Sequence, residues 1–161
     1  MAFPNPPAYA GSKKQSSQGT SIWVNYQAGV STSPPAWVFI GECLGAKFGD
    51  KNMFEKSTNL QSEAEEFLPI LPDPGKLNVT LNRVSTDAGQ QALQAAKLSG
   101  VRLGFAVVLP INAAAGQTTA GDQRQFQAYV ESLAPDIAAN KGITSAFDLQ
   151  ISGPITDIQG S

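Results

Sequence analysis

The sequence predicts a mainly β protein of six or seven strands with a single α-helix, an extended N-terminal arm and a long inter-strand loop. Short stretches alternate apolar and polar residues with a period of two, which is typical of strands buried on one face. Only one segment carries helix start and stop signals. The 161 residues predict one domain over 21–156, an arm over 1–20 and a C-terminal tail over 157–161 that we expect to be loose.

The arm and the first two strands come before the long loop. Prolines 4, 6 and 7 and a Ser/Gln/Lys stretch predict an extended, flexible arm. Residues 22–26 and 36–44 are rich in β-branched and aromatic side chains, so both predict strands. We interpret Trp23, Tyr26 and Trp37 as core residues and Cys43 as a buried thiol.

Residues 45–66 predict a long, irregular connection with a purpose, because compact domains rarely keep more than about twenty structureless residues. Aromatic and thioether side chains stand among charges in it, which indicates a docking loop. The candidate inter-subunit residues are Phe48, Met53, Phe54, Glu55 and Lys56.

A turn and a clear strand follow the loop. Pro74 and Gly75 occupy the positions that a type II turn favours. Residues 76–82 alternate strictly, with an apolar side that predicts core and a polar stripe opposite. The apolar side is Leu77, Val79 and Leu81, and the stripe is Asn78, Thr80 and Asn82.

One helix is predicted over 88–98. Ser85 or Thr86 is the expected N-cap, Asp87 lies near the positive end of the helix dipole, and Gly100 stops the helix. The predicted apolar side is small, so we expect the helix to lie on a sheet. It consists of Ala88, Ala92, Leu93, Ala96 and Leu98.

Three further strands complete the domain. Residues 101–110 predict a strand buried on both faces. Residues 123–133 alternate an amide face with an apolar one before a turn at 134–136, and the last strand carries Phe147, Leu149 and Ile151 inward. The outward polar residues on these strands are Gln123, Gln125, Gln127, Asp148 and Gln150, and with the stripe on 76–82 they indicate contact surfaces.

Composition indicates a surface that makes contacts. Charged residues are 15% of the chain, against about 25% in an average soluble domain. Ser, Thr, Asn and Gln number 44 against 24 charged residues. Amides and hydroxyls are less costly to desolvate than charges, and the net charge of −2 argues against a site with affinity for nucleic acid.

Enzyme chemistry has little support. The chain has no histidine, which excludes the common triads and His-ligated metals. Glu63, Glu65 and Glu66 offer a carboxylate pair, but a solvated segment is the better interpretation. We expect no enzymatic activity, no cofactor and no metal, and the lack of a long apolar run predicts no membrane anchor.

Three stretches carry a family resemblance. They are the turn and strand Asp73-Pro74-Gly75-Lys76-Leu77-Asn78-Val79-Thr80-Leu81-Asn82, the helix start Asp87-Ala88-Gly89-Gln90-Gln91-Ala92-Leu93, and the endings Phe126-Gln127-Ala128-Tyr129-Val130 and Leu149-Gln150-Ile151-Ser152-Gly153-Pro154-Ile155. In this order, over about 36–156, the chain resembles the tail tube (major tail) proteins of long-tailed bacteriophages, the family of the phage lambda major tail protein.

The resemblance implies a structural virion protein with the tail-tube β-sandwich. It implies stacked homohexameric rings that form a hollow tube for double-stranded DNA, with part of each sheet joined to its neighbours in a barrel and the loop at 45–66 reaching another subunit or ring. The outward polar residues are then candidates for a lumen or inter-subunit face: Asn78, Thr80, Asn82, Gln123, Gln125, Gln127, Asp148 and Gln150. The implied partners are further copies of the chain, the tape measure protein, the tail terminator and the distal tail protein, with DNA only as passing cargo. The implied location is the virion tail, assembled in the host bacterial cytoplasm.

Two alternatives stay open on the sequence. The inner tubes of contractile tails and the tubes of secretion systems share this architecture. A β-sandwich module of a virion surface that recognises a host carbohydrate or protein is the second, and paired aromatic side chains on an exposed face would favour it.

Overall fold

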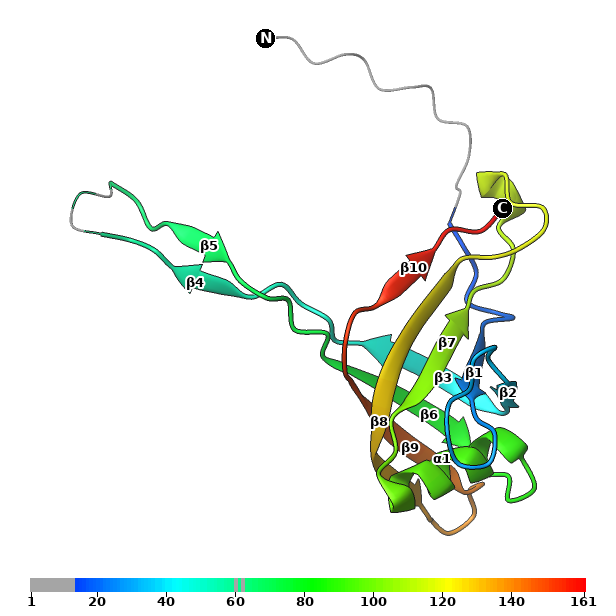
Figure 1. The fold of residues 1–161 in the computed structure, drawn as a ribbon. Coiled ribbons are helices and arrows are strands. Elements are labelled where there is room, and N and C mark those ends of the chain that lie inside the picture. The colour runs from blue at the N-terminus through cyan, green and yellow to red at the C-terminus, as the bar shows by residue number, and fades with distance from the viewer. Residues whose placement is uncertain (1–13, 60, 62) are drawn as a thin grey trace.

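The computed structural model describes residues 14–161 except 60 and 62, and within them it is mainly β with a single α-helix (Figure 1). The strands are β1 (Ser21–Asn25), β2 (Trp37–Ile40), β3 (Cys43–Phe48), β4 (Phe54–Lys56), β5 (Phe67–Pro69), β6 (Lys76–Asn82), β7 (Leu103–Val108), β8 (Gln123–Asp136), β9 (Thr144–Ile151) and β10 (Thr156–Ile158). The α-helix is α1 (Ala88–Ser99), and a 3-10 turn, η1, covers Ala113–Ala115. The predicted fold class is confirmed.

One antiparallel sheet makes the body, in the order β2-β1-β7-β8-β9-β6-β3, with β10 paired to β8. On a flat sheet β3 would lie about 14 Å from β8, because neighbouring strands are about 4.8 Å apart. Yet the rings of Phe48 on β3 and Phe126 on β8 are 5.6 Å apart, edge to face. The sheet therefore curls so that its two ends face each other across the core.

Strand β8 belongs to both halves of the curled sheet. Its first residues pair with β7 and its later residues with β9, with a bulge between Val130 and Ser132. We call β2, β1, β7, the first half of β8 and β10 layer A, and the second half of β8, β9, β6 and β3 layer B. The outer faces of the two layers point away from each other.

The core lies between the layers, and its side chains are those that the alternation predicted. Each of the strands β6, β8 and β9 buries every second residue on its inner side. Phe105 stacks on Phe126 with 5.9 Å between ring centroids. The buried cluster is Ile22, Val24, Ile40, Leu77, Val79, Leu81, Ala92, Leu93, Ala96, Leu103, Phe105, Val107, Phe126, Ala128, Val130, Phe147, Leu149 and Ile151.

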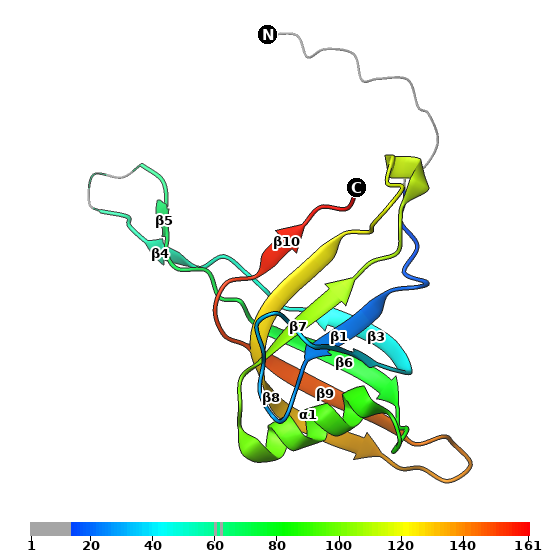
Figure 2. The ribbon, with the colours of Figure 1, turned by 45° about the vertical axis from the view of Figure 1, so that its right-hand side comes forward.

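Helix α1 closes one end of the body, where it packs on β8 and β2 (Figure 2). Its N-cap is Asp87, whose carboxylate accepts from the backbone N–H of Gln90, so the predicted cap at Ser85 or Thr86 is wrong. Asp87 also accepts from the N–H of Gly41, a contact distant in sequence that decides between neighbouring cap candidates. Leu98, predicted to face the sheet, is 83% exposed, which narrows the buried side of the helix to Gly89, Ala92, Leu93 and Ala96.

The region before β6 differs from the prediction. The strand expected over 36–44 breaks at Glu42, where φ is +60°, into β2 and β3. The irregular loop expected over 45–66 is also wrong: its first residues complete β3 against β6, and β4 and β5 pair as a separate two-stranded ribbon. Trp37 is 37% exposed rather than core, because it points to the outer side of layer A.

Both ends of the described chain lie at the end of the body opposite α1 (Figure 1). The amide of Gln15 donates to the carbonyl of Pro110, and the first thirteen residues of the predicted arm lie outside the described residues. The C-terminal residues are not loose as predicted. Strand β10 pairs with β8, and the backbone oxygen of Ser161 accepts from three consecutive N–H groups at residues 118–120.

Candidate functional site: assembly surfaces

The outer face of layer B carries two of the predicted polar stripes side by side. Asn78 on β6 lies directly opposite Asp148 on β9, and Lys76 lies opposite Gln150. Thr80 and Asn82 continue the stripe, and Asn82 donates to the carboxylate of Glu42. Lys76 pairs with Glu131 at 2.7 Å, which raises the pKa of this lysine. The face is therefore polar and close to neutral.

The third stripe lies on layer A and faces the other way. Gln123, Gln125 and Gln127 stand opposite Val108, Ala106 and Gly104 of β7. Further along the same face the rings of Trp23 and Phe39 contact each other at 5.2 Å, and Phe39 is 47% exposed. The stripes that the sequence grouped together thus lie on the outer faces of both layers.

The ribbon of β4 and β5 projects from the body (Figure 1). From here on, residues 50–73 are called the arm, and the segment predicted over 1–20 is called the N-terminal segment. Two bridging hydrogen bonds between Lys51 and Asp73 close the base of the arm. Four of the five residues predicted as a docking loop lie here or at its start: Met53, Phe54, Glu55 and Lys56.

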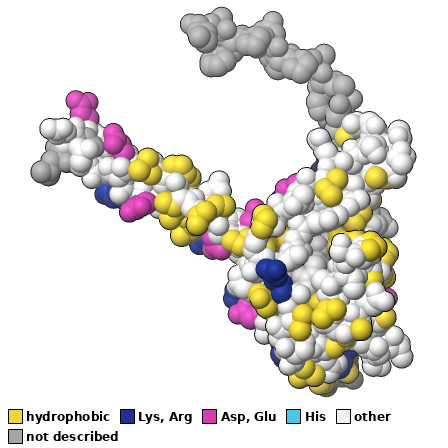
Figure 3. Space-filling model, viewed as in Figure 1, with side chains coloured by type: hydrophobic (Ala, Val, Ile, Leu, Met, Phe, Trp, Pro, Cys, Tyr) yellow, Lys and Arg dark blue, Asp and Glu magenta, His cyan; other side chains and the backbone are white. Residues whose placement is uncertain are grey.

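Apolar side chains cover the stem of the arm (Figure 3). Phe54 is 59% exposed, and five others are exposed as well: Met53, Phe67, Leu68, Ile70 and Leu71. An isolated two-stranded ribbon is marginal in water, so such a surface indicates a partner. The sequence reasoning missed the second strand of the arm, although the apolar run at 67–71 would have indicated it.

Phe48, the fifth predicted docking residue, is not on the arm. It ends β3 and packs on Phe126 inside the curled sheet, so it contributes to the core rather than to a docking tip. The guanidinium of Arg124 lies 4.8 Å from the Phe48 ring centre.

Arg124 joins the base of the arm to the C-terminal strand. It donates to both carboxylate oxygens of Asp157, at 2.7 and 3.0 Å, and to Asp50 at 3.4 Å. The hydrogen bond to Asp157 raises the pKa of Arg124. Together with the cation–π contact, these hydrogen bonds fix the base of the arm to strands β8 and β10.

No catalytic arrangement forms in the part of the chain that the structure describes. Glu63, Glu65 and Glu66 lie on the exposed arm, where Lys56 pairs with Glu65. Among the described residues, no group of side chains is arranged to bind a metal ion. No helix of the described chain is long and apolar enough to cross a membrane. Burial raises the pKa of the Cys43 thiol to about 11, with a further contribution from Asp87.

The family model of lambda-like phage tail tube proteins matches residues 13–159. The chain belongs to this family. It is a structural protein of the phage tail tube and a component of the virion tail.

Solved structures agree with the family at the level of the fold. The SPP1 tail tube protein aligns with a TM-score of 0.71 at 15% identity, over 92% of this chain and 80% of that one. The tail of an empty gene transfer agent particle, refined with C6 symmetry, aligns with a TM-score of 0.68 at 14% identity, over 89% and 98%. A chain of the anti-feeding prophage baseplate gives 0.62 at 9% identity, over 99% and 98%. No curated protein sequence matches.

Proposed function

We propose that this tail tube protein assembles into stacked homohexameric rings whose channel conducts double-stranded DNA during ejection. The free edges of layer B carry this proposal. Strand β3 is a sheet edge with four of its six residues exposed, and residues 129–136 of β8 pair with no strand on the β7 side. Unpaired edges invite strand addition, and a closed barrel removes them.

The outer face of layer B is the proposed channel lining. Its candidates are Asn78, Thr80, Asn82, Asp148 and Gln150. Each Lys or Arg that contacts phosphate holds DNA through counterion release, so a near-neutral amide surface lets the polyanion pass. The glutamine stripe on layer A, Gln123, Gln125 and Gln127, then faces away from the channel.

The arm is the proposed inter-subunit element. Met53, Phe54, Glu55 and Lys56 lie on a ribbon whose two strands pair only with each other among the described strands, and its exposed apolar stem would be covered by a neighbouring copy. Family analogy supplies the other proposed partners: the tape measure protein, the tail terminator and the distal tail protein. The proposed place of assembly is the host bacterial cytoplasm.

The direct test is electron microscopy of the purified, concentrated protein, alone and with the tail's initiator proteins. We expect hollow tubes with six-fold rings. A protein that stays monomeric in every condition would refute the proposal, and tubes of another symmetry would refute the hexamer alone.

One observation favours a second candidate, a module that binds a host carbohydrate or protein. Phe39 and Trp37 are exposed on layer A, beside a groove also lined by Arg102, Gln125 and Gln127. Aromatic faces with amide and guanidinium groups suit sugar recognition. Saturable binding on a glycan array, lost in Trp37→Ala, would support this candidate.

A further inference from the structure

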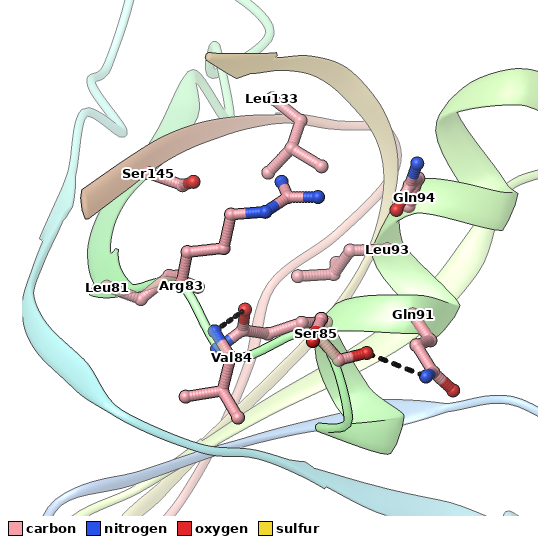
Figure 4. Close-up of a pocket in the computed structure, with 10 residues that line it drawn as sticks. Leu81, Arg83, Val84, Ser85, Gln91, Leu93, Gln94, Leu133 and Ser145 are labelled. Carbon is pink, nitrogen blue, oxygen red and sulfur yellow. Dashed lines mark hydrogen bonds between the residues drawn. The ribbon is translucent and has the colours of Figure 1, made fainter. Parts of the chain in front are cut away.

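A small pocket beside α1 is lined by Arg83, an exposed residue whose side chain has no hydrogen bond or ion pair among the described residues (Figure 4). The pocket has a volume of about 80 Å³, and Figure 4 shows the guanidinium of Arg83 within it, between Leu133 and the helix side chain Gln94. Among the described residues, none hydrogen-bonds to this guanidinium, and no carboxylate lines the pocket. Room of this size exceeds that of one water molecule and admits a carboxylate group.

A second unpartnered polar group opens into the same pocket. Ser145 on β9 is 1% exposed, and its hydroxyl has no hydrogen-bond partner in the described part of the chain. Buried hydroxyl groups are normally hydrogen-bonded, so this one is short of an acceptor. Figure 4 shows its oxygen directed toward the Arg83 side chain. A guanidinium and a hydroxyl that share a pocket are a matched pair of donors for one carboxylate.

The arm carries carboxylates that lack a basic partner. Residues 50–73 contain six acidic and two basic residues, a net charge of −4, whereas the rest of the chain has seven acidic and nine basic residues, a net charge of +2. Within the arm, Asp50, Asp73 and Glu65 are ion-paired. Glu55, Glu63 and Glu66 have no such partner, and the last two flank the tip.

We propose that the acidic tip of one copy's arm docks into the Arg83 pocket of a second copy, with Glu63 or Glu66 bound by the guanidinium of Arg83 and the hydroxyl of Ser145. This inference rests on the proposed function and names the surface that receives the arm. Exposed apolar residues adjoin the pocket, because the carbonyl of Ile143 accepts from the N–H of Arg83 and Ile137 is 73% exposed on the same β8–β9 turn. They face the apolar stem of the docked arm.

The geometry favours a second copy over the arm's own body. The arm points away from the body, and α1 lies at a different end (Figures 1 and 2). A contact between two different surfaces of the same chain is heterologous, and such contacts generate rings or filaments rather than closed dimers. The docking therefore propagates, as assembly of a tube requires.

Charge reversal with rescue tests the docking. Each variant is a full-length chain, and the critical concentration for tube formation is measured by sedimentation and electron microscopy. We expect Arg83→Glu, and separately Glu63→Lys with Glu66→Lys, to raise it about tenfold, since each reverses a charge pair at the contact. The chain that carries all three changes should assemble at a lower critical concentration than the Arg83→Glu variant or the Glu63→Lys, Glu66→Lys variant. Arg102→Glu, at an exposed arginine just before β7 with no ion pair among the described residues, is the control for net charge.

Ser145→Ala separates docking from folding. It removes an unpartnered buried hydroxyl, so the isolated monomer should melt at the same temperature or higher, while the critical concentration rises. Normal assembly of both Arg83→Glu and Ser145→Ala, or a triple variant no better than Arg83→Glu alone, would overturn the docking and leave the tube proposal standing. A wild-type chain that never associates would overturn both.

Discussion

The apolar stem of the arm offers the sharpest test of how the copies associate. Phe54 and Phe67 lie on one face of the ribbon, because Phe54 is opposite Pro69 and Lys56 is opposite Phe67. They are 59% and 56% exposed. A phenylalanine side chain has roughly 200 Å² of surface, so the pair shows roughly 220 Å² of apolar area to water.

Covering this area completely would stabilise the contact by about 5.5 kcal/mol at ~25 cal/mol per Å², and covering half of it by about 2.8 kcal/mol. We therefore expect Phe54→Ser with Phe67→Ser to raise the critical concentration for assembly about 100-fold, since each ~1.4 kcal/mol is tenfold. The monomer should lose less than about 2 °C in melting temperature, because exposed substitutions rarely exceed ~0.5 kcal/mol.

Sedimentation of assembled tubes against monomer, over a concentration series, measures the effect. Ile111→Ser is the matched control, because Ile111 is 49% exposed after β7 and lies outside both the arm and the pocket beside α1. A folded Phe54→Ser, Phe67→Ser chain that assembles within threefold of the wild-type concentration would show that the stem is not buried between copies.

Three further outcomes are expected from single sites. Thr80→Lys should slow DNA ejection from phage particles at low salt and recover as salt screens phosphate, whereas Gln125→Lys on the opposite surface should not; equal effects, followed with a DNA-binding dye, would contradict the assignment of the channel face. Asp87→Ala should cost about 1 kcal/mol and about 3 °C in thermal unfolding, while Ser85→Ala, at a side chain that caps nothing, should not change the transition. The Cys43 thiol, with a pKa of about 11, should react with a thiol reagent at pH 8 roughly 100-fold more slowly than an ordinary thiol; its rate should rise steeply toward pH 11, and a normal rate at pH 8 would refute the burial.

The strands that bury one face were readable from the sequence, and the surfaces that we propose to meet another copy were not. Leu77, Val79 and Leu81 alternate with polar residues because the core lies on one side of β6 only, and a period of two reports that. The residues of β3 and of the arm have no such constraint within the chain. Most of these side chains are exposed, so their sequence lacks the period-two alternation that predicts a strand, and we predicted a loop.

Cap choice and strand breaks were decided by contacts distant in sequence. Ser85, Thr86 and Asp87 are all good N-cap residues, and only Asp87 also reaches the N–H of Gly41. The Arg124 cluster could not be predicted either, because residues 48–50, Arg124 and Asp157 come from three separate stretches of the chain. Alternation assigns each residue to one side of its own strand. It does not predict whether the polar sides of two different strands lie on the same surface of a curled sheet.

The few charges of the chain are unevenly distributed between the arm and the rest of the molecule. The arm holds a net −4 and the remainder +2, so two arms repel each other while an arm and a body attract. This difference disfavours symmetric pairing through the arms and favours head-to-tail contacts, the class that can continue without limit. In the proposed tube, much of each subunit's surface is buried between copies or faces DNA, so few charges are needed there. The charged residues without an ion pair in the described part of the chain include Glu63 and Glu66 near the tip of the arm and Arg83 in the pocket beside α1.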